Sequence, residues 1–424
     1  FFKQKTAYEI YQCDWSSDVC SSDLGLPFSL VCAKAGHRVW GVDVNEELIL
    51  ALNEGEVPYI EQGAKELLSK YLEEGMVEFT TNSSFIKHSD VIAIMLGTPV
   101  DHENNPRLDG LFNFIDNTLV PFIKKDQLIL LRSTVSPGTT ELVKDRIERK
   151  TGLREGVDFF LVFCPERVLQ GKSIEETETL PQIIGAFSEI SFHVAKVFNN
   201  TYNKSEQIHL TPREAEIGKL MTNMYRYVTF ALANEFWMIG EKQGVNIERV
   251  TKAINKDYKR MDLPLPGPNV GGPCLFKDGR FLLSDIPFGD LIQTSFLINE
   301  GMPDYIFNRI RLLQPKIKKV LILGAAFKAN CDDTRNSLSF KMKKVCIKNG
   351  VEVDMIDPLA DKQLPLPKFS SSDYDAIIVM TPHDVFKITN LNLYRKDCVI
   401  ADVWKFFDES KNTQSGIYKI GDIL

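Results

Sequence analysis

The feature that most constrains the fold of this 424-residue chain is a set of short apolar runs that alternate with helical segments. Clear examples of such runs are Asp90–Pro99, Gln127–Arg132, Lys319–Gly324 and Asp375–Pro382. Strands that are apolar at nearly every position are typical of parallel sheets, because helices cover both faces of these sheets. The sequence therefore predicts an α/β protein, and its length suits two or three domains.

The segment that starts at Gly25 has the pattern of a dinucleotide-binding unit. A helical run over residues 28–35 is followed by a strand that ends at Asp43. Gly25 takes the place of the third glycine of G-x-G-x-x-G, and Asp43 that of the acidic residue that binds the adenosine ribose. Thr98 and Thr134 follow later strands, where ligands of such sheets bind. We expect all four residues to contact the cofactor.

The first 24 residues do not fit this pattern. Their apolar residues keep neither the period of a strand nor that of a helix. The stretches KQKTAYE and DWSSDVCSSDL resemble a translated sequencing-adapter peptide. We interpret Phe1–Leu24 as an assembly artefact, with a disordered natural tail as the alternative. On this interpretation the first strand and the first two glycines of the fingerprint are missing.

A second nucleotide-binding-like domain is predicted near the C-terminus. The runs 319–324, 353–358 and 375–382 repeat the layout of the first domain without a full glycine fingerprint, so we expect a different nucleotide ligand. Between the two domains, Thr211-Pro212-Arg213-Glu214 forms a capping box and starts one long amphipathic helix that Gly244 would end. A helix of this length suits a domain connector or the spine of a homodimer.

The composition narrows the classes of function. A net charge of −7 gives no reason to expect nucleic acid or an anionic membrane as partner. The eight cysteines contain no C-x-x-C pair, so their spacing indicates neither a zinc site nor a disulfide framework. Apolar runs stay well short of the roughly 20 residues of a membrane helix, and the first residues lack the apolar stretch of a signal peptide. We therefore expect a cytoplasmic protein.

Cys274 is the strongest candidate for a nucleophile. It follows Gly271, Gly272 and a proline, so its backbone is expected to be tight and exposed rather than part of a core. Lys277 and Asp278 can favour the thiolate and supply a path for a proton. Taken alone, a free cysteine in such a chain is more often a small buried hydrophobic residue.

Seven short motifs follow one another along the chain: Gly25-Leu26-Pro27, Gly97-Thr98-Pro99, Ser133-Thr134-Val135-x-Pro137-Gly138-Thr139, Pro165-Glu166-Arg167-Val168-Leu169, Lys219 with Asn223, Gly272-Pro273-Cys274-Leu275-x-Lys277-Asp278, and Ala326-Phe327-Lys328-x-Asn330-x-Asp332-Asp333-Thr334-Arg335. Each motif alone is weak, but their order and spacing together are specific. From Gly25 to the C-terminus the chain resembles the UDP-sugar 6-dehydrogenases. These enzymes oxidise the C6 alcohol of a UDP-hexose to a carboxylate with two NAD+.

The resemblance implies a catalytic role for five residues. Cys274 would form a thiohemiacetal and then a thioester with the substrate, which water cleaves. Lys219 and Asn223, four apart on a helix, would reach the developing oxyanion; a solvated helix surface is the alternative for this pair. Glu166 would act as general base in thioester hydrolysis. Asp278 would order water or assist Lys219, and a buried structural ion pair is its alternative.

Binding roles follow from the same resemblance. Lys277 and Arg335 would contact NAD phosphates or the nicotinamide side, and Lys328 the sugar nucleotide. The stretches around Arg167 and Gly271 look like the branch of the family that acts on N-acetylated sugars, so both residues are expected at the substrate. The chain departs from the family pattern at Gln170, Phe276, Cys331, Trp404 and Lys405. These departures leave the exact sugar open.

The expected architecture is two doubly wound Rossmann-like domains joined by a helical central region with one long helix. The NAD-binding domain would cover residues 25–205, the central region 206–314, and the UDP-sugar-binding domain 315–424. The leading hypothesis is an NAD-dependent dehydrogenase of a UDP-N-acetylhexosamine, such as UDP-N-acetylmannosamine, that serves surface-polysaccharide precursors.

Two alternatives to this hypothesis remain. Within enzymes the alternative is UDP-glucose 6-dehydrogenase. From another class it is a UDP-sugar-binding chain that cannot hold NAD, because the glycine loop is replaced. We expect a homodimer, and we expect the chain as it stands to be inactive.

Overall fold

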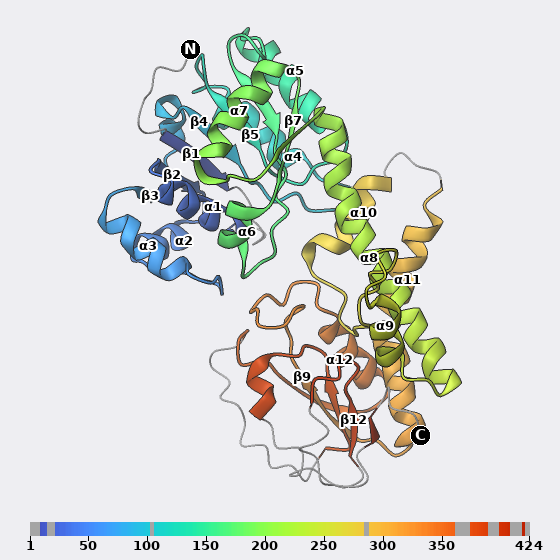
Figure 1. Cartoon of the computed structure of the whole chain (residues 1–424). Coiled ribbons are helices and arrows are strands. Elements are labelled where there is room, and N and C mark those ends of the chain that lie inside the picture. Colours follow the sequence, from blue (N-terminus) through green and yellow to red (C-terminus); the bar gives the residue numbers. More distant parts are fainter. Residues whose placement is uncertain are drawn as a thin grey trace. The chain divides into compact units, whose positions relative to one another are not determined.

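The computed structural model describes residues 9–14, 22–101, 106–283, 288–360, 374–388, 398–407 and 418–419. The chain divides into two compact units, which Figure 1 shows in the colours of the sequence. The first unit contains Phe1–Thr222 and Lys277–Ile286, and the second contains Asn223–Phe276 and Pro287–Leu424. Each unit is built on its own β-sheet.

Eight strands of the described residues form the sheet of the first unit, in the order β3-β2-β1-β4-β5-β6-β7-β8. Their bounds are β1 Glu9–Asp14, β2 Arg38–Asp43, β3 Val77–Thr80, β4 Val91–Ile94, β5 Leu128–Leu131, β6 Phe160–Phe163, β7 Gln182–Ala186 and β8 Gln207–Leu210. All neighbours are parallel except β6 and β7. The first six strands have the dinucleotide-binding order, in which the strand order reverses between β1 and β4.

Helices cover both faces of this sheet, as the alternation of strand residues requires. The helices are α1 Ser22–Lys34, α2 Glu46–Asn53, α3 Ala64–Glu73, α4 Asp109–Phe114, α5 Thr139–Thr151, α6 Ser173–Thr179 and α7 Glu189–Tyr202, with short turns η1 Ser83–His88 and η2 Ile115–Leu119. In β5, Leu128 and Leu130 join the apolar cluster that includes residues of α1, α2 and α7. Ile129 and Leu131 join the cluster of α4 and α5. The predicted doubly wound sheet is confirmed.

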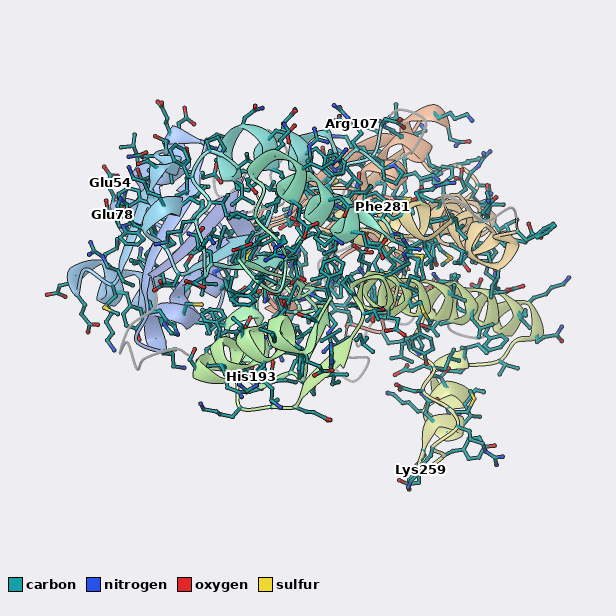
Figure 2. All side chains as sticks on the ribbon, turned by 90° about the horizontal axis from the view of Figure 1, so that it is seen from above. Glu54, Glu78, Arg107, His193, Lys259 and Phe281 are labelled. Atoms are coloured by element: carbon teal, nitrogen blue, oxygen red, sulfur yellow. The ribbon has the colours of Figure 1, made fainter. Side chains whose placement is uncertain are left out.

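The edge of the sheet at β3 carries charge. Glu78 lies on this edge strand with its side chain exposed, and the exposed Glu54 follows α2, so both carboxylates face outward (Figure 2). Charged residues on an edge strand discourage pairing with the strand of another molecule.

The prediction that residues 1–24 form neither strand nor helix is wrong. Glu9–Asp14 is the strand β1, which pairs in parallel with β2 on one side and β4 on the other. The helix α1 already begins at Ser22, ahead of the predicted start at residue 28. Side-chain periodicity missed the strand because its hydrogen bonds come from the backbone of two neighbouring strands.

The second unit contains a smaller parallel sheet with the order β10-β9-β11-β12-β13 among the described residues. The strands are β9 Lys319–Leu323, β10 Glu352–Ile356, β11 Ala376–Val379, β12 Val399–Ala401 and β13 Tyr418–Lys419. Its helices are α9 Ile247–Asn255, α11 Asp290–Leu313 and α12 Leu338–Lys348, with the turn η3 Asp384–Ile388. This is the second common order of doubly wound domains, so the predicted second Rossmann-like domain is confirmed.

The long helix α8 spans Pro212–Gln243 and starts with the predicted capping box. The Thr211 N–H donates to Glu214 Oε2 at 2.8 Å, and the Glu214 N–H donates to Thr211 Oγ1 at 3.4 Å. Gly244, with a φ of 66°, follows the last helical residue. With 32 residues the helix is about 48 Å long. No helix of the described residues combines the length and apolarity needed to cross a membrane.

Candidate active site

Cys274 is the second residue of the helix α10, Pro273–Leu283. The preceding Gly272 has a φ of 95°, and a Cβ at this position would lie 2.9 Å from the Phe327 ring. The positive φ of Gly272 fits the predicted tight turn, and Gly272 itself is buried. A position in the first turn of a helix favours the thiolate form of a cysteine.

The carboxyl ends of β4 and β5 bring three predicted residues together. The Thr98 hydroxyl, which is buried, donates a hydrogen bond to the carbonyl oxygen of Thr134. Lys277, three residues after Cys274 on α10, donates from Nζ to the carbonyl oxygen of Thr98 at 2.9 Å. Asp278 follows with its side chain fully buried. The first unit thus holds Thr98, Thr134 and Lys277 at the edge where the topology predicts a ligand.

Glu166 has a partner that sequence reasoning missed. Its buried carboxylate forms an ion pair with Arg132, whose side chain has no exposed surface. Burial would lower the pKa of Arg132, but the adjacent Glu166 carboxylate raises it above its ordinary value overall. The guanidinium also lies over the Phe28 ring at 4.3 Å. The signal was an arginine directly after an apolar strand, because such a residue needs a buried counter-charge.

The neighbouring Arg167 is half-buried and forms hydrogen bonds with Glu166 and Pro181. Its N–H donates to Glu166 Oε1 at 3.0 Å, and its guanidinium donates to the carbonyl oxygen of Pro181. The Glu166 carboxylate is thus held in place by the Arg132 guanidinium and by the backbone N–H of Arg167.

Lys219 and Asn223 both lie on α8, one helical turn apart. Lys219 is half-buried and Asn223 is buried, at 7 % exposure. A solvated helix surface is therefore excluded for Asn223.

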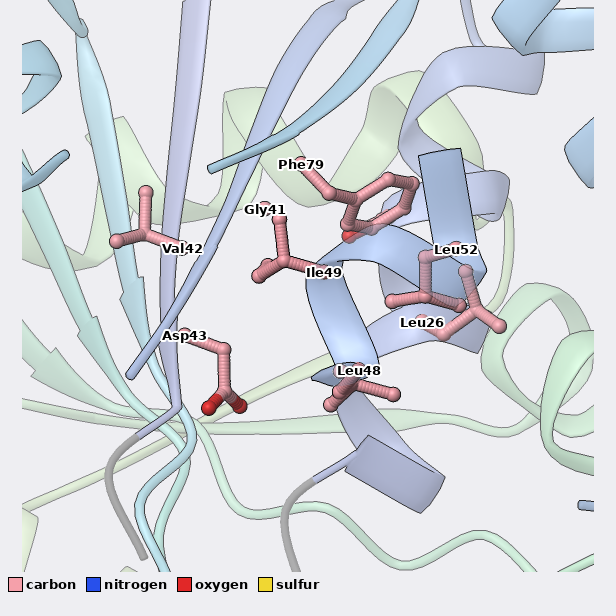
Figure 3. A pocket seen from close by; sticks show the side chains of 10 residues that line it. Leu26, Gly41, Val42, Asp43, Leu48, Ile49, Leu52 and Phe79 are labelled. Carbon is pink, nitrogen blue, oxygen red and sulfur yellow. The ribbon is translucent and has the colours of Figure 1, made fainter. Parts of the chain in front are cut away.

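A small pocket in the first unit is lined by Asp43, which was predicted at the adenosine ribose and is labelled in Figure 3. Gly25, predicted as the third glycine of the fingerprint, lines the same pocket. Asp43 ends β2, and Gly25 lies in the first turn of α1. Leu26, Ile49 and Phe79 supply apolar walls. Burial raises the pKa of Asp43 to about 6, although the N–H groups of Asn45 and Val44 favour the charged form. Above this pH the carboxylate is an acceptor suited to ribose hydroxyls.

The remaining predicted residues lie in the second unit. Lys328 is half-buried on the segment Ala325–Asn330, which follows β9. Arg335 is held by Asp333, since its Nε donates to Asp333 Oδ1 at 2.8 Å and its Nη2 to Oδ2. Gly271 lies close to the backbone that follows Arg335, because a Cβ added at Gly271 would lie 2.5 Å from the carbonyl oxygen of Asn336. In the second unit, the segment that contains Gly271 thus lies next to the segment that follows β9 and contains Lys328 and Arg335.

Three family models cover most of the chain in order. Residues 21–204 match the NAD binding domain, residues 213–293 the central domain, and residues 321–409 the UDP binding domain of the UDP-glucose/GDP-mannose dehydrogenase family.

Similar proteins extend the match to nearly full length. A UDP-N-acetyl-D-mannosamine dehydrogenase of Pyrococcus horikoshii is 34% identical and covers 87% of this chain and 89% of its own. A solved structure of UDP-D-ManNAc dehydrogenase from the same species gives a TM-score of 0.88 at 32% identity and covers 97% of this chain and 99% of its own. The UDP-N-acetyl-mannosamine dehydrogenase structure from Staphylococcus aureus gives 0.83 at 29% identity, with 97% and 98% covered.

Similarity over this length, on a fold with the dinucleotide-binding strand order, defines an NAD-dependent nucleotide-sugar dehydrogenase. The chain belongs to the UDP-glucose/GDP-mannose dehydrogenase family and contains all three of its domains. Asp43 and the turn of α1 that carries Gly25 fit the adenosine ribose of NAD. The pyrophosphate side fits less well, because no glycine lies between Asp14 and Gly25, where backbone N–H groups should approach phosphate.

Proposed function

We propose that this chain represents an enzyme that oxidises the C6 alcohol of UDP-N-acetylmannosamine to the carboxylate. The observation that carries the proposal is the 34% identity, over most of both chains, to the P. horikoshii enzyme of that name. The segment from Gly271 to Asp278 supports it, because oxidation of an aldehyde to an acid requires a covalent handle such as Cys274. The product would serve the synthesis of surface-polysaccharide precursors in the cytoplasm.

In the proposed reaction, the alcohol first loses a hydride and a proton to give the aldehyde. The Cys274 thiolate adds to the aldehyde carbon, and Lys219 and Asn223 stabilise the oxyanion. Loss of the second hydride gives a thioester. Water cleaves this thioester, releasing the carboxylate and the thiol, with Glu166 and Asp278 orienting the water. NAD+, when bound, would supply the acceptor for each hydride.

Two alternatives compete with this proposal. UDP-glucose is the alternative substrate, because the departures from the family pattern include Trp404 and Lys405 near the expected sugar site. A UDP-sugar-binding chain without turnover is the alternative from another class. The absence of glycine between Asp14 and Gly25 favours it, since NAD would lack backbone donors for its pyrophosphate.

The experiment is NADH production with UDP-N-acetylmannosamine, UDP-N-acetylglucosamine and UDP-glucose offered separately. Two proteins are compared: the chain itself, and a glycine-turn variant in which Trp15–Leu24 is replaced by five residues of the pattern Gly-x-Gly-x-x. Two NADH per UDP-N-acetylmannosamine from the variant would support the proposal. Two NADH per UDP-glucose, without turnover of the acetylated sugars, would replace the substrate. UDP binding without NADH from either protein would favour the binding chain.

We also propose a homodimer formed through α8. Large apolar side chains that are 37 to 66 % exposed recur along one side of this helix, and we call them the α8 stripe: Met221, Tyr225, Leu232, Phe236 and Ile239. Their spacing of three, four and seven residues places them on one face. A contiguous apolar stripe of this size on a helix is typical of a subunit interface.

The α8 stripe predicts the effect of charge on assembly. Tyr225→Asp with Phe236→Asp is expected to convert the dimer into a 48.1 kDa monomer, because two carboxylates would be buried without partners. Sedimentation velocity measures the masses. Arg226→Asp is the control, since this exposed residue lies on α8 outside the stripe and should leave the dimer intact. A wild-type protein that sediments as a monomer at micromolar concentration would contradict the proposal.

A further inference from the structure

A buried asparagine, Asn269, joins two segments of the second unit. It lies five residues before Cys274 and is 4 % exposed. Its Nδ2 lies 3.0 Å from the carbonyl oxygen of Ala326, 3.0 Å from Ser337 Oγ and 3.1 Å from Thr381 Oγ1. An amide nitrogen has two hydrogens, so it is fully satisfied by this cage of acceptors.

The oxygen of the same amide holds the start of α12. The Leu338 N–H, the first of this helix, donates to Asn269 Oδ1 at 2.8 Å. The first N–H groups of a helix have no partner inside the helix, so an external acceptor satisfies one of them. The amide nitrogen of Asn269 therefore binds the segment after β9, and its amide oxygen binds the first residue of α12.

Near Asn269, the backbone at Gly271 and Gly272 contacts the backbone at Asn336, just before α12. The Gly272 N–H donates to the carbonyl oxygen of Asn336 at 3.3 Å. Any side chain at Gly271 would collide with the same carbonyl, and one at Gly272 would press on Phe327. Because these contacts are close, a displacement of the segment 325–336 would also displace the turn at Gly271 and Gly272.

Two further buried side chains fix the segment Ala325–Asn330 from its other side. The Asp357 carboxylate accepts hydrogen bonds from the N–H groups of Ala325 at 2.7 Å and Ala326 at 2.8 Å. His383 Nδ1 accepts from the Asn330 N–H at 2.9 Å, so the ring proton is on Nε2, which donates to Asp357 at 3.0 Å. The segment that carries Lys328 is therefore held at both ends, and Asn269 links it to Gly271–Cys274.

We propose that Asn269 is a positioning residue that couples occupation of the UDP site to the placement of Cys274. The proposal rests on the proposed function, in which Lys328 contacts the sugar nucleotide and Cys274 is the nucleophile. A nucleotide that orders the Lys328 segment also orders the Asn269 amide, and with it the turn that presents Cys274. UDP alone, without the reacting sugar, should then change the reactivity of the thiol.

The experiment measures alkylation of Cys274 by iodoacetamide in the full-length chain, with and without saturating UDP, located by peptide mass spectrometry. In the wild type, UDP is expected to change the rate by about fivefold or more, the usual lower range of coupling between sites. Asn269→Asp keeps the acceptor for Leu338 but places an oxygen against the Ala326 carbonyl. Asn269→Ala removes the hydrogen bonds to Ala326 and from Leu338, and it replaces Asn269→Asp in the experiment if that variant does not fold. Calorimetry measures UDP binding in each protein.

Both Asn269 variants are expected to bind UDP and to lose the effect of UDP on Cys274. Tyr305→Phe is the matched control, because it removes a 2.8 Å hydrogen bond to Glu241 in the same unit and should keep the effect. A merely structural role would lower the melting temperature of all three variants without changing how Cys274 responds to UDP. An unchanged response in both Asn269 variants would overturn the coupling and leave the proposed function standing. Failure of the wild type to bind UDP would overturn both.

Discussion

The glycine-turn variant is expected to bind NAD roughly 10²–10³ times more tightly than the chain itself, because two or three hydrogen bonds to the pyrophosphate are gained. In the chain, β1 ends at Asp14 beside Asp43, and ten residues without glycine separate it from Gly25. Five residues of the pattern Gly-x-Gly-x-x would make Gly25 the third glycine of the fingerprint. Backbone N–H groups could then approach phosphate at the start of α1. Calorimetric titration with NAD+ measures the change.

Two further variants distinguish the effect of the glycine turn on NAD affinity from the effect of the strand β1. A variant with Ala-x-Ala-x-x in place of Trp15–Leu24 has the same length, but its Cβ atoms keep phosphate away, so its affinity should stay low. A second variant replaces all of Phe1–Leu24 with a strand and a glycine turn, and tests whether Glu9–Asp14 serves as a native strand would. If neither glycine-containing variant gains affinity, the first 24 residues are not what limits NAD binding.

Cys274→Ala, made in the glycine-turn variant, is expected to lower the rate of carboxylate formation by about 10⁴-fold or more, as removal of a covalent nucleophile does. The first oxidation does not need a thiol, so the variant should produce at most one NADH per sugar and leave the aldehyde. NADH absorbance and mass spectrometry of the nucleotide sugar report the two steps separately.

A buried cysteine provides the control for this substitution. Cys346 lies in the apolar core of the second unit, and burial raises the pKa of its thiol to about 12. It is a thiol at neutral pH, so Cys346→Ala should keep two NADH per sugar at a small cost in stability. Two NADH per sugar from Cys274→Ala would show that another group forms the covalent intermediate.

Much of the fold was predictable because many of its strands, such as β4, β5, β6 and β11, are buried on both faces. Runs such as 128–131 and 376–379 are apolar at every position, as is typical of strands in a sheet covered on both sides. β1 was missed, since its polar residues carry no such signal and its place depends on backbone hydrogen bonds from β2 and β4.

The candidate site was predictable as a set of segments but not as a set of contacts. Thr98 and Thr134 meet because strand ends share one edge, which topology alone implies. The ion pair of Arg132 with Glu166 joins residues 34 apart, and the bonds of Asn269 reach as far as Thr381. Such pairs depend on the register of neighbouring strands and on loop paths, which no local pattern encodes.

The discontinuity of the first unit affects how the protein is made. Its last part, Lys277–Ile286, is separated from Thr222 by a stretch that belongs to the second unit. At roughly 5–20 residues per second, a ribosome needs roughly 3–13 s to go from Thr222 to Ile286. During this interval the described strands of the large sheet have been synthesised but Thr98 still lacks its hydrogen bond from Lys277, so the first unit gains this contact only after Cys274 has also been synthesised.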